Sequence, residues 1–289
     1  MRLPGGQTGR AKAHGAIARL LVLLLLLGAC TRSLEAWLEE GEAALKAYRL
    51  DDAERAFLRA LDRNPASPRA LYGLGWTHHL RGNEVAARVY FEQCIEVAPG
   101  YYGGYKGMGS VHLAMGYYDQ AEASFQRAIE LKPDEAATYA SLGYVYFVTN
   151  RLDLAEEAFR KAAALEPDRG ETHYLLAELK ARQGDLKQAL EQLDAAESRA
   201  IEEVKFRFLA RKLRGQVLLR MALEGISPNR APQISSDERQ RRLEMLEEAE
   251  QAFQDALKLS VLRDRVQLNR LLRKVRRARA RLSGDETSP

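Results

Sequence analysis

The stretch Ala155-Glu156-Glu157-Ala158-Phe159 decides the fold, because its first alanine and its phenylalanine recur along the chain at one constant spacing. The alanine register is Ala53, Ala87, Ala121, Ala155 and Ala189, and the bulky register is Phe57, Phe91, Phe125, Phe159 and Leu193. Two further registers share the period. The first is Gly41, Gly75, Gly109 and Gly143, with Ala177 at the same position in the fifth unit. The second is Pro65, Pro99, Pro133 and Pro167. Small residues beside a bulky one at helical spacing predict closely packed helix pairs, the first four of which are ended by a proline.

This pattern resembles the tetratricopeptide repeat (TPR), a helix-turn-helix unit of about 34 residues whose copies stack into a solenoid. The resemblance covers residues 34–201 as five repeats. It implies an all-α fold, an α-solenoid of TPR helix-turn-helix repeats with a C-terminal capping helix. It also implies a non-enzymatic scaffold that binds other proteins.

The period fails after residue 201, but residues 202–260 keep the marks of a degenerate sixth repeat. A helix expected from Val204 to Leu223 carries its glycine at Gly215, and Ala249 and Phe253 repeat the second-helix spacing. The interval from the glycine to the alanine is longer than in the other repeats, which indicates an insertion of about 22 residues at 225–246. Residues 261–283 then predict a basic capping helix with an apolar stripe, and residues 284–289 a disordered tail.

The first 29 residues have the features of a cleavable export signal. The apolar run Leu20 to Leu27 is far shorter than the roughly 20 residues of a membrane span. It ends in Leu27-Gly28-Ala29-Cys30, which resembles the lipobox of bacterial lipoproteins and implies a lipid on Cys30, with residues 30–33 as a short tether. Thr31 implies the periplasmic face of the outer membrane, since inner-membrane lipoproteins of many diderm bacteria carry aspartate there. An ordinary signal or an uncleaved anchor is the alternative.

The formal charge of +4 comes entirely from this leader, through Arg2, Arg10, Lys12 and Arg19. The rest of the chain is neutral overall, which gives no sign of a nucleic-acid partner. Beyond Cys30 the chain has one further cysteine, Cys94, expected to be a buried space-filler. Residues 100–107 contain several glycines, which fit a hinge, close backbone packing or the approach of a ligand.

The sequence contains no recognisable catalytic constellation. It has no glycine-rich phosphate loop, no His-Glu-x-x-His, no Gly-x-Ser-x-Gly and no paired Cys-x-x-Cys. His78 and His112 occupy a packing register, and His173 falls in another. We therefore expect no enzyme activity, no cofactor and no metal site.

The family resemblance implies a partner-binding groove lined by recurring positions of the first helices, and it gives a protein or peptide as the ligand. Aromatic side chains at such positions supply contact area at low entropic cost. The groove positions are Tyr72, Trp76 and His79 in the second repeat, Lys106 and Ser110 in the third, Tyr144 and Phe147 in the fourth, and Tyr174, Glu178 and Arg182 in the fifth. Some of these rings could instead pack between repeats.

The last helix has a basic face that either is a solvated cap or binds an anionic partner. No aromatic residue interleaves with its cations, so a stacking platform for single strands is missing. This basic end consists of Arg263, Arg265, Arg270, Arg273, Lys274, Arg276 and Arg277.

Among lipid-anchored members of the family, the chain resembles the pilotin group, which brings the secretins of type IV pili or secretion systems to the outer membrane. The alternative is an adaptor for cell-wall hydrolases or outer-membrane protein assembly. A third hypothesis, of another class, is a cytoplasmic regulator whose basic end binds nucleic acid.

Overall fold

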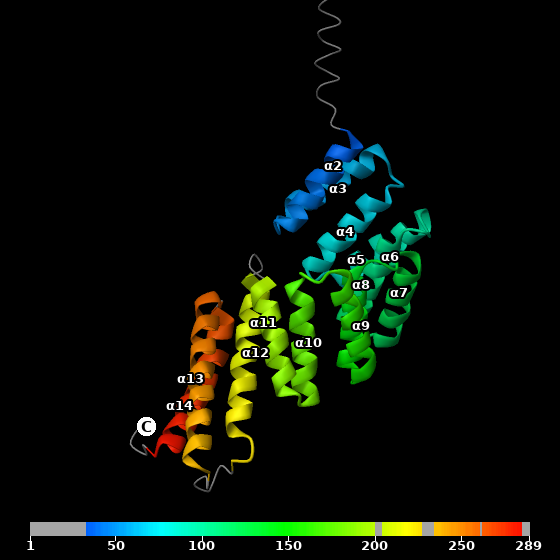
Figure 1. Ribbon diagram of the computed structural model, residues 1–289. Coiled ribbons are helices and arrows are strands. Elements are labelled where there is room, and N and C mark those ends of the chain that lie inside the picture. The colour runs from blue at the N-terminus through cyan, green and yellow to red at the C-terminus, as the bar shows by residue number, and fades with distance from the viewer. Residues whose placement is uncertain (1–32, 200–203, 227–233, 261, 285–289) are drawn as a thin grey trace, which may run out of the picture. The chain divides into compact units, whose positions relative to one another are not determined.

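The computed structural model describes residues 33–199, 204–226, 234–260 and 262–284. Their regular secondary structure is entirely α-helical and comprises 13 helices (Figure 1). The first ten come two to a sequence repeat: α2 (Leu34–Lys46) and α3 (Leu50–Arg63), α4 (Pro68–Leu80) and α5 (Glu84–Val97), α6 (Tyr102–Ala114) and α7 (Tyr118–Leu131), α8 (Ala136–Val148) and α9 (Leu152–Leu165), and α10 (Gly170–Gln183) and α11 (Leu186–Arg199). The last three are α12 (Val204–Leu223), α13 (Ser236–Leu259) and α14 (Leu262–Ser283).

The chain divides into two compact units, the first ending at Met115 and the second beginning at Gly116. The boundary falls between α6 and α7, the two helices of the third repeat. The uniform period of the sequence gives no indication of this division. Each unit is described by itself below.

Burial confirms the alanine and phenylalanine registers. All five alanines, the four phenylalanines and Leu193 are fully buried. Phe57 fits between two glycines, since a Cβ at Gly41 or at Gly73 would overlap its ring. Gly75 and Gly107 lie in the same way against Phe91, and Gly143 against Phe159, so glycines let the helices approach closely around these rings.

The glycine-rich start of α6 is explained by close packing. A Cβ at Gly104 would lie 2.7 Å from Ile95 Cγ1, and one at Gly107 would overlap the ring of Phe91. At Gly103 the obstructing atoms belong to Tyr101. Of the three explanations that the sequence left open, the structure supports backbone packing at these positions.

The turn between the two helices of each repeat contains one residue whose backbone lies in the left-handed region of φ and ψ, and this residue recurs once per period. This register consists of Tyr48 (φ 56°), Gly82 (φ 76°), Gly116 (φ 80°), Asn150 (φ 63°) and Gly184 (φ 92°). Glycine and asparagine tolerate this conformation well. Tyrosine does not, so the first turn carries a strain that the others avoid.

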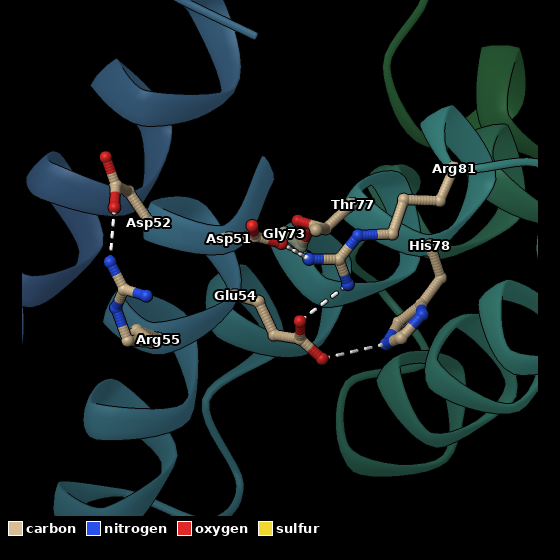
Figure 2. A network of polar contacts seen from close by, with 8 residues as sticks. All are labelled: Asp51, Asp52, Glu54, Arg55, Gly73, Thr77, His78 and Arg81. Carbon is tan, nitrogen blue, oxygen red and sulfur yellow. Dashed lines mark hydrogen bonds and ion pairs between the residues drawn. The ribbon is translucent and has the colours of Figure 1, made fainter. Parts of the chain in front are cut away.

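A polar network joins the first two repeats (Figure 2). Glu54 of α3 lies between Arg81 and His78, with its carboxylate 2.5 Å from the Arg81 guanidinium and 3.6 Å from His78 Nε2. Arg81 also reaches Asp51 at 2.6 Å. Hydrogen bonds to Glu54 and Asp51 raise the pKa of Arg81 although burial opposes the shift. The contacts tie α3 to the end of α4.

The C-terminal three helices share one core, in which α12 packs on α13 and both contact α14. Gly215 lies against Phe253, the contact that the degenerate repeat predicts. The Ser235 hydroxyl accepts from the backbone N–H of Glu238 and caps α13. The apolar stripe of α14 is buried at Leu268, Leu272, Val275 and Leu282, and Leu271 is half-buried.

Candidate partner-binding surfaces

In the first unit, the predicted groove residues Tyr72 and Trp76 of α4 are half-buried and pack on Phe91. Their rings meet edge to face with centroids 6.1 Å apart, and Tyr101 approaches Tyr72 at 5.8 Å. The buried Nε1 of Trp76 has no hydrogen-bond partner among the described residues. Much of the area of these two rings is therefore used in packing on α5 of the same repeat and on the segment that begins the third repeat.

The other three predicted groove residues of this unit are half-buried. His79 packs edge to face on Trp76 at 5.1 Å, and its Nδ1 lies 2.7 Å from a Glu84 carboxylate oxygen. Ser110 donates to the carbonyl of Lys106 at 3.2 Å, one turn earlier in α6. These residues thus combine an aromatic patch with local polar contacts.

In the second unit, an arginine stacks on an aromatic ring. The Arg182 guanidinium of α10 lies 4.7 Å from the ring centroid of Phe147 in α8. It donates to the Phe147 carbonyl at 3.0 Å and to Asn150 Oδ1 at 3.1 Å. Phe147 stacks in turn on Tyr144, whose side chain is 39% exposed.

A half-buried acid lies next to this stack. Burial raises the pKa of Glu178, while a hydrogen bond from Tyr174 and the charges of Arg182 and Lys212 oppose the shift. Burial and the nearby carboxylate raise the pKa of Tyr174. Tyr174 also packs against Phe206 of α12, with centroids 6.3 Å apart.

We call this set of residues on α8, α10 and α12 the aromatic–charged face: Tyr144, Phe147, Tyr174, Glu178, Arg182 and Lys212. The sequence analysis missed Lys212 because groove positions were assigned only in the regular repeats, which end at 201. Yet Lys212 lies three residues before Gly215, as Lys106 lies before Gly109 and Tyr174 before Ala177, so applying the groove register to α12 would have found it. The face combines rings, one acid and two cations, a set that can bind a peptide through both apolar area and hydrogen bonds.

The basic end lies on α14. The side chains of Arg265, Arg270, Arg273, Lys274, Arg276 and Arg277 are all exposed, whereas the side chain of Arg263 lies outside the described residues. Although Asp264 is the one acid in the helix sequence, α13 supplies a second. Its Glu250 lies 2.9 Å from Arg276 and 3.4 Å from Arg279.

The predicted lipid site, Cys30, lies outside the described residues. Within the described ranges, no helix is both long enough and apolar enough to cross a bilayer. The same part of the chain shows no cluster of His, Cys, Asp or Glu side chains able to hold a metal ion.

Comparison with protein families matches the tetratricopeptide-repeat description over residues 38–101 and 107–171, and a second tetratricopeptide-repeat model over residues 170–195. One curated relative, cellulose synthase 2 operon protein C of Komagataeibacter xylinus, is 38% identical over 68 residues. That match covers 24% of this chain, which spans only 5% of the relative's length.

Several solved structures share the fold. TTC0263, a TPR protein of Thermus thermophilus, is 29% identical with a TM-score of 0.58, over 63% of this chain and 98% of that one. The Cut9–Hcn1 complex of APC/C is 16% identical with a TM-score of 0.67, over 84% and 43%. PilF of Pseudomonas aeruginosa is 16% identical with a TM-score of 0.54, over 73% and 97%. From its registers, its helix pairs and these matches, the chain belongs to the tetratricopeptide-repeat family of protein-interaction scaffolds.

Proposed function

We propose that this protein is a lipid-anchored scaffold at the periplasmic face of the outer membrane, and that it binds a segment of an envelope-assembly protein on the aromatic–charged face. The observation that carries the proposal is the stack of Arg182 on Phe147 beside the exposed ring of Tyr144. Hydrogen bonds to the Phe147 carbonyl and Asn150 hold the guanidinium in place before any partner arrives. A preorganised surface loses less entropy on binding.

The chemistry of the face suits an extended peptide. Tyr144 offers apolar area, and the Tyr174–Glu178 pair offers polar atoms that can meet backbone amides of a ligand. Aromatic and arginine side chains are the residue types that most often dominate binding energy. The packing of Tyr72 and Trp76 on Phe91 leaves the second unit as the better candidate.

The location rests on the sequence, through the leader and the lipobox-like residues ending at Cys30. For the client, we propose a secretin of a pilus or secretion system, in keeping with the resemblance to pilotins. The likeness to PilF is consistent with this choice, although at 16% identity it establishes only a common fold.

Site-specific photocrosslinking in cells tests the face. A crosslinker replacing Tyr144 should capture a defined partner, because that ring is 39% exposed within the face. The matched control is a crosslinker at Leu154 of α9, which is 42% exposed outside it. Recovery of a secretin from position 144 alone supports the proposal. A murein hydrolase would favour the adaptor alternative, and the same proteins from both positions would remove the face as the binding site.

The anchor is tested separately, by labelling cells with radioactive palmitate. The wild-type chain should incorporate label and fractionate with the outer membrane, whereas a Cys30→Ala variant should incorporate none. Label that survives in the variant contradicts the anchor. Recovery of the native chain in the cytosol would contradict the location and revive the hypothesis of a nucleic-acid regulator.

A further inference from the structure

One face of α14 carries a continuous row of cations, which we call the α14 ridge: Arg270, Arg273, Lys274, Arg277 and Arg281. All five side chains are exposed. Their spacing of three, four, seven and eleven residues from the first places them on one side of a helix. At 1.5 Å per residue the row is about 16 Å long.

The charges of the ridge are not balanced within the described residues. None of the five side chains forms an ion pair there, and Asp264 is the one acid in α14. The neighbouring Arg276 and Arg279, by contrast, both reach Glu250. A cap that merely needed to be soluble would mix charges of both signs. The ridge instead concentrates a single sign, which costs self-repulsion in the free protein.

The core of the second unit fixes the direction in which the ridge faces. Leu268, Leu272 and Val275 alternate with the ridge residues and are buried against α12 and α13. The helix therefore cannot rotate without exposing this stripe. The cations are presented as a fixed row and not as a flexible basic tail.

The ridge lacks the features of a specific protein or nucleic-acid site. No aromatic or large apolar anchor lies among its five cations, and such anchors carry most of the energy of a protein interface. Rings on which bases could stack are missing as well. One turn before Arg270, on the same side, Val266 is 75% exposed. A row of cations flanked by an exposed aliphatic side chain fits the boundary between headgroups and acyl chains.

We propose that the α14 ridge binds the anionic phospholipid headgroups of a bilayer surface. The cations contact the phosphates collectively, and no single side chain reads a particular headgroup. This contact would be a second attachment to the membrane, independent of both Cys30 and the aromatic–charged face. Two weak attachments together hold a protein far longer than either alone.

Vesicle sedimentation tests the proposal with the full chain carrying Cys30→Ala, so that no acyl chain is present. The protein is titrated with phosphatidylcholine vesicles and with vesicles that also contain phosphatidylglycerol. The difference between them isolates the electrostatic contribution, since residues 20–27 can insert into either. The leader cations Arg2, Arg10, Lys12 and Arg19 also add to this contribution, so variants of α14 in the same background are needed to assign the share of the ridge. We expect tighter binding to the anionic vesicles, weakened by added salt.

Two double variants of the same helix separate the ridge from net charge. Arg273→Gln/Arg277→Gln removes two ridge cations, and Arg276→Gln/Arg279→Gln removes the two that reach Glu250. Each ridge cation is expected to contribute about fivefold, so the first variant should bind anionic vesicles about 25-fold more weakly. The second should lose clearly less, about fivefold, because Glu250 offsets one of its two charges and both arginines lie toward α13 and not on the ridge.

Three results would overturn the proposal. The first is equal binding to neutral and anionic vesicles, and the second is an equal loss in both double variants. The third is tighter binding to duplex DNA than to anionic vesicles at the same phosphate concentration and salt, which would assign the ridge to nucleic acid. Circular dichroism of each variant checks that the helices are retained. Arg270→Gln/Lys274→Gln repeats the test if the first ridge variant fails to fold.

Discussion

Gly215 of α12 lies against the ring of Phe253 in α13, so that a Cβ at residue 215 would be 2.6 Å from Phe253 Cε1. The contact recurs between Gly143 and Phe159, with the same 2.6 Å separation. It persists where the regular period has failed and the second helix comes late in the sequence. The close approach of glycine and phenylalanine therefore defines a repeat pair here better than sequence spacing does.

We predict that Gly215→Ala destabilises the second unit. The added methyl group must displace the Phe253 ring, and overpacking costs about 1–3 kcal/mol, offset by up to about 1 kcal/mol of helix propensity. Urea unfolding followed by circular dichroism measures the net loss. Gly100→Ala is the control, because no heavy atom lies within 4 Å of a Cβ there, and its effect should stay within about 0.5 kcal/mol. Equal midpoints for both variants would contradict the packing argument.

Tyr48→Gly should stabilise the first unit. Tyr48 has a φ of 56° and is 70% exposed, so its side chain gives little packing in return for the strained backbone. Left-handed backbone costs a residue with a Cβ about 1–2 kcal/mol, and the flexibility of unfolded glycine returns part of that. A gain of roughly 0.5–1 kcal/mol is therefore expected. Both tryptophans, Trp37 and Trp76, lie in this unit, so their fluorescence during urea unfolding reports it directly. A loss of stability would refute the prediction.

The helices of each repeat could be predicted from the sequence because the residues that repeat are the ones that are buried. Ala155 and Phe159 recur for packing reasons, and packing tolerates few alternatives. The register of left-handed turn residues was missed because a turn tolerates more residue types than a packed core does. Tyr48 and Asn150 stand where Gly82 and Gly184 stand in other repeats, which hides the period.

The site was less predictable than the fold. The resemblance marks both Tyr72 and Tyr144 as groove residues, but their use depends on the neighbouring helix, which sequence alone does not supply. Tyr72 contacts Phe91 and Tyr101, whereas Tyr144 remains 39% exposed. The division at Gly116 was equally invisible, since that glycine fits the turn register like its counterparts.

Cys94 should be nearly inert in the folded protein. It is fully buried, and its Sγ lies 3.3 Å from the Pro68 carbonyl oxygen. Burial raises the pKa of this thiol from 9.0 to about 12. Since the thiolate is the reactive form, its population falls on the order of a thousandfold. In a Cys30→Ala background, Ellman's reagent at mildly alkaline pH should react quickly only after urea is added. Rapid reaction without urea would show that α4 and α5 open readily.

Glu178 and Glu156 should respond to pH with opposite sign. Burial raises the pKa of Glu178, so its ionised form destabilises the fold above that pKa, and the penalty is relieved as pH falls through it. A hydrogen bond from Lys180 lowers the pKa of Glu156, so its contribution is present above the unfolded value and lost as pH falls through the folded one. Glu178→Gln should therefore raise the urea midpoint at neutral pH, and Glu156→Gln should lower it. The difference in urea midpoint between each variant and the wild-type protein should become smaller at acid pH. Circular dichroism across the acid range measures them, and variants that change the midpoint in the same direction would show that desolvation does not dominate at Glu178.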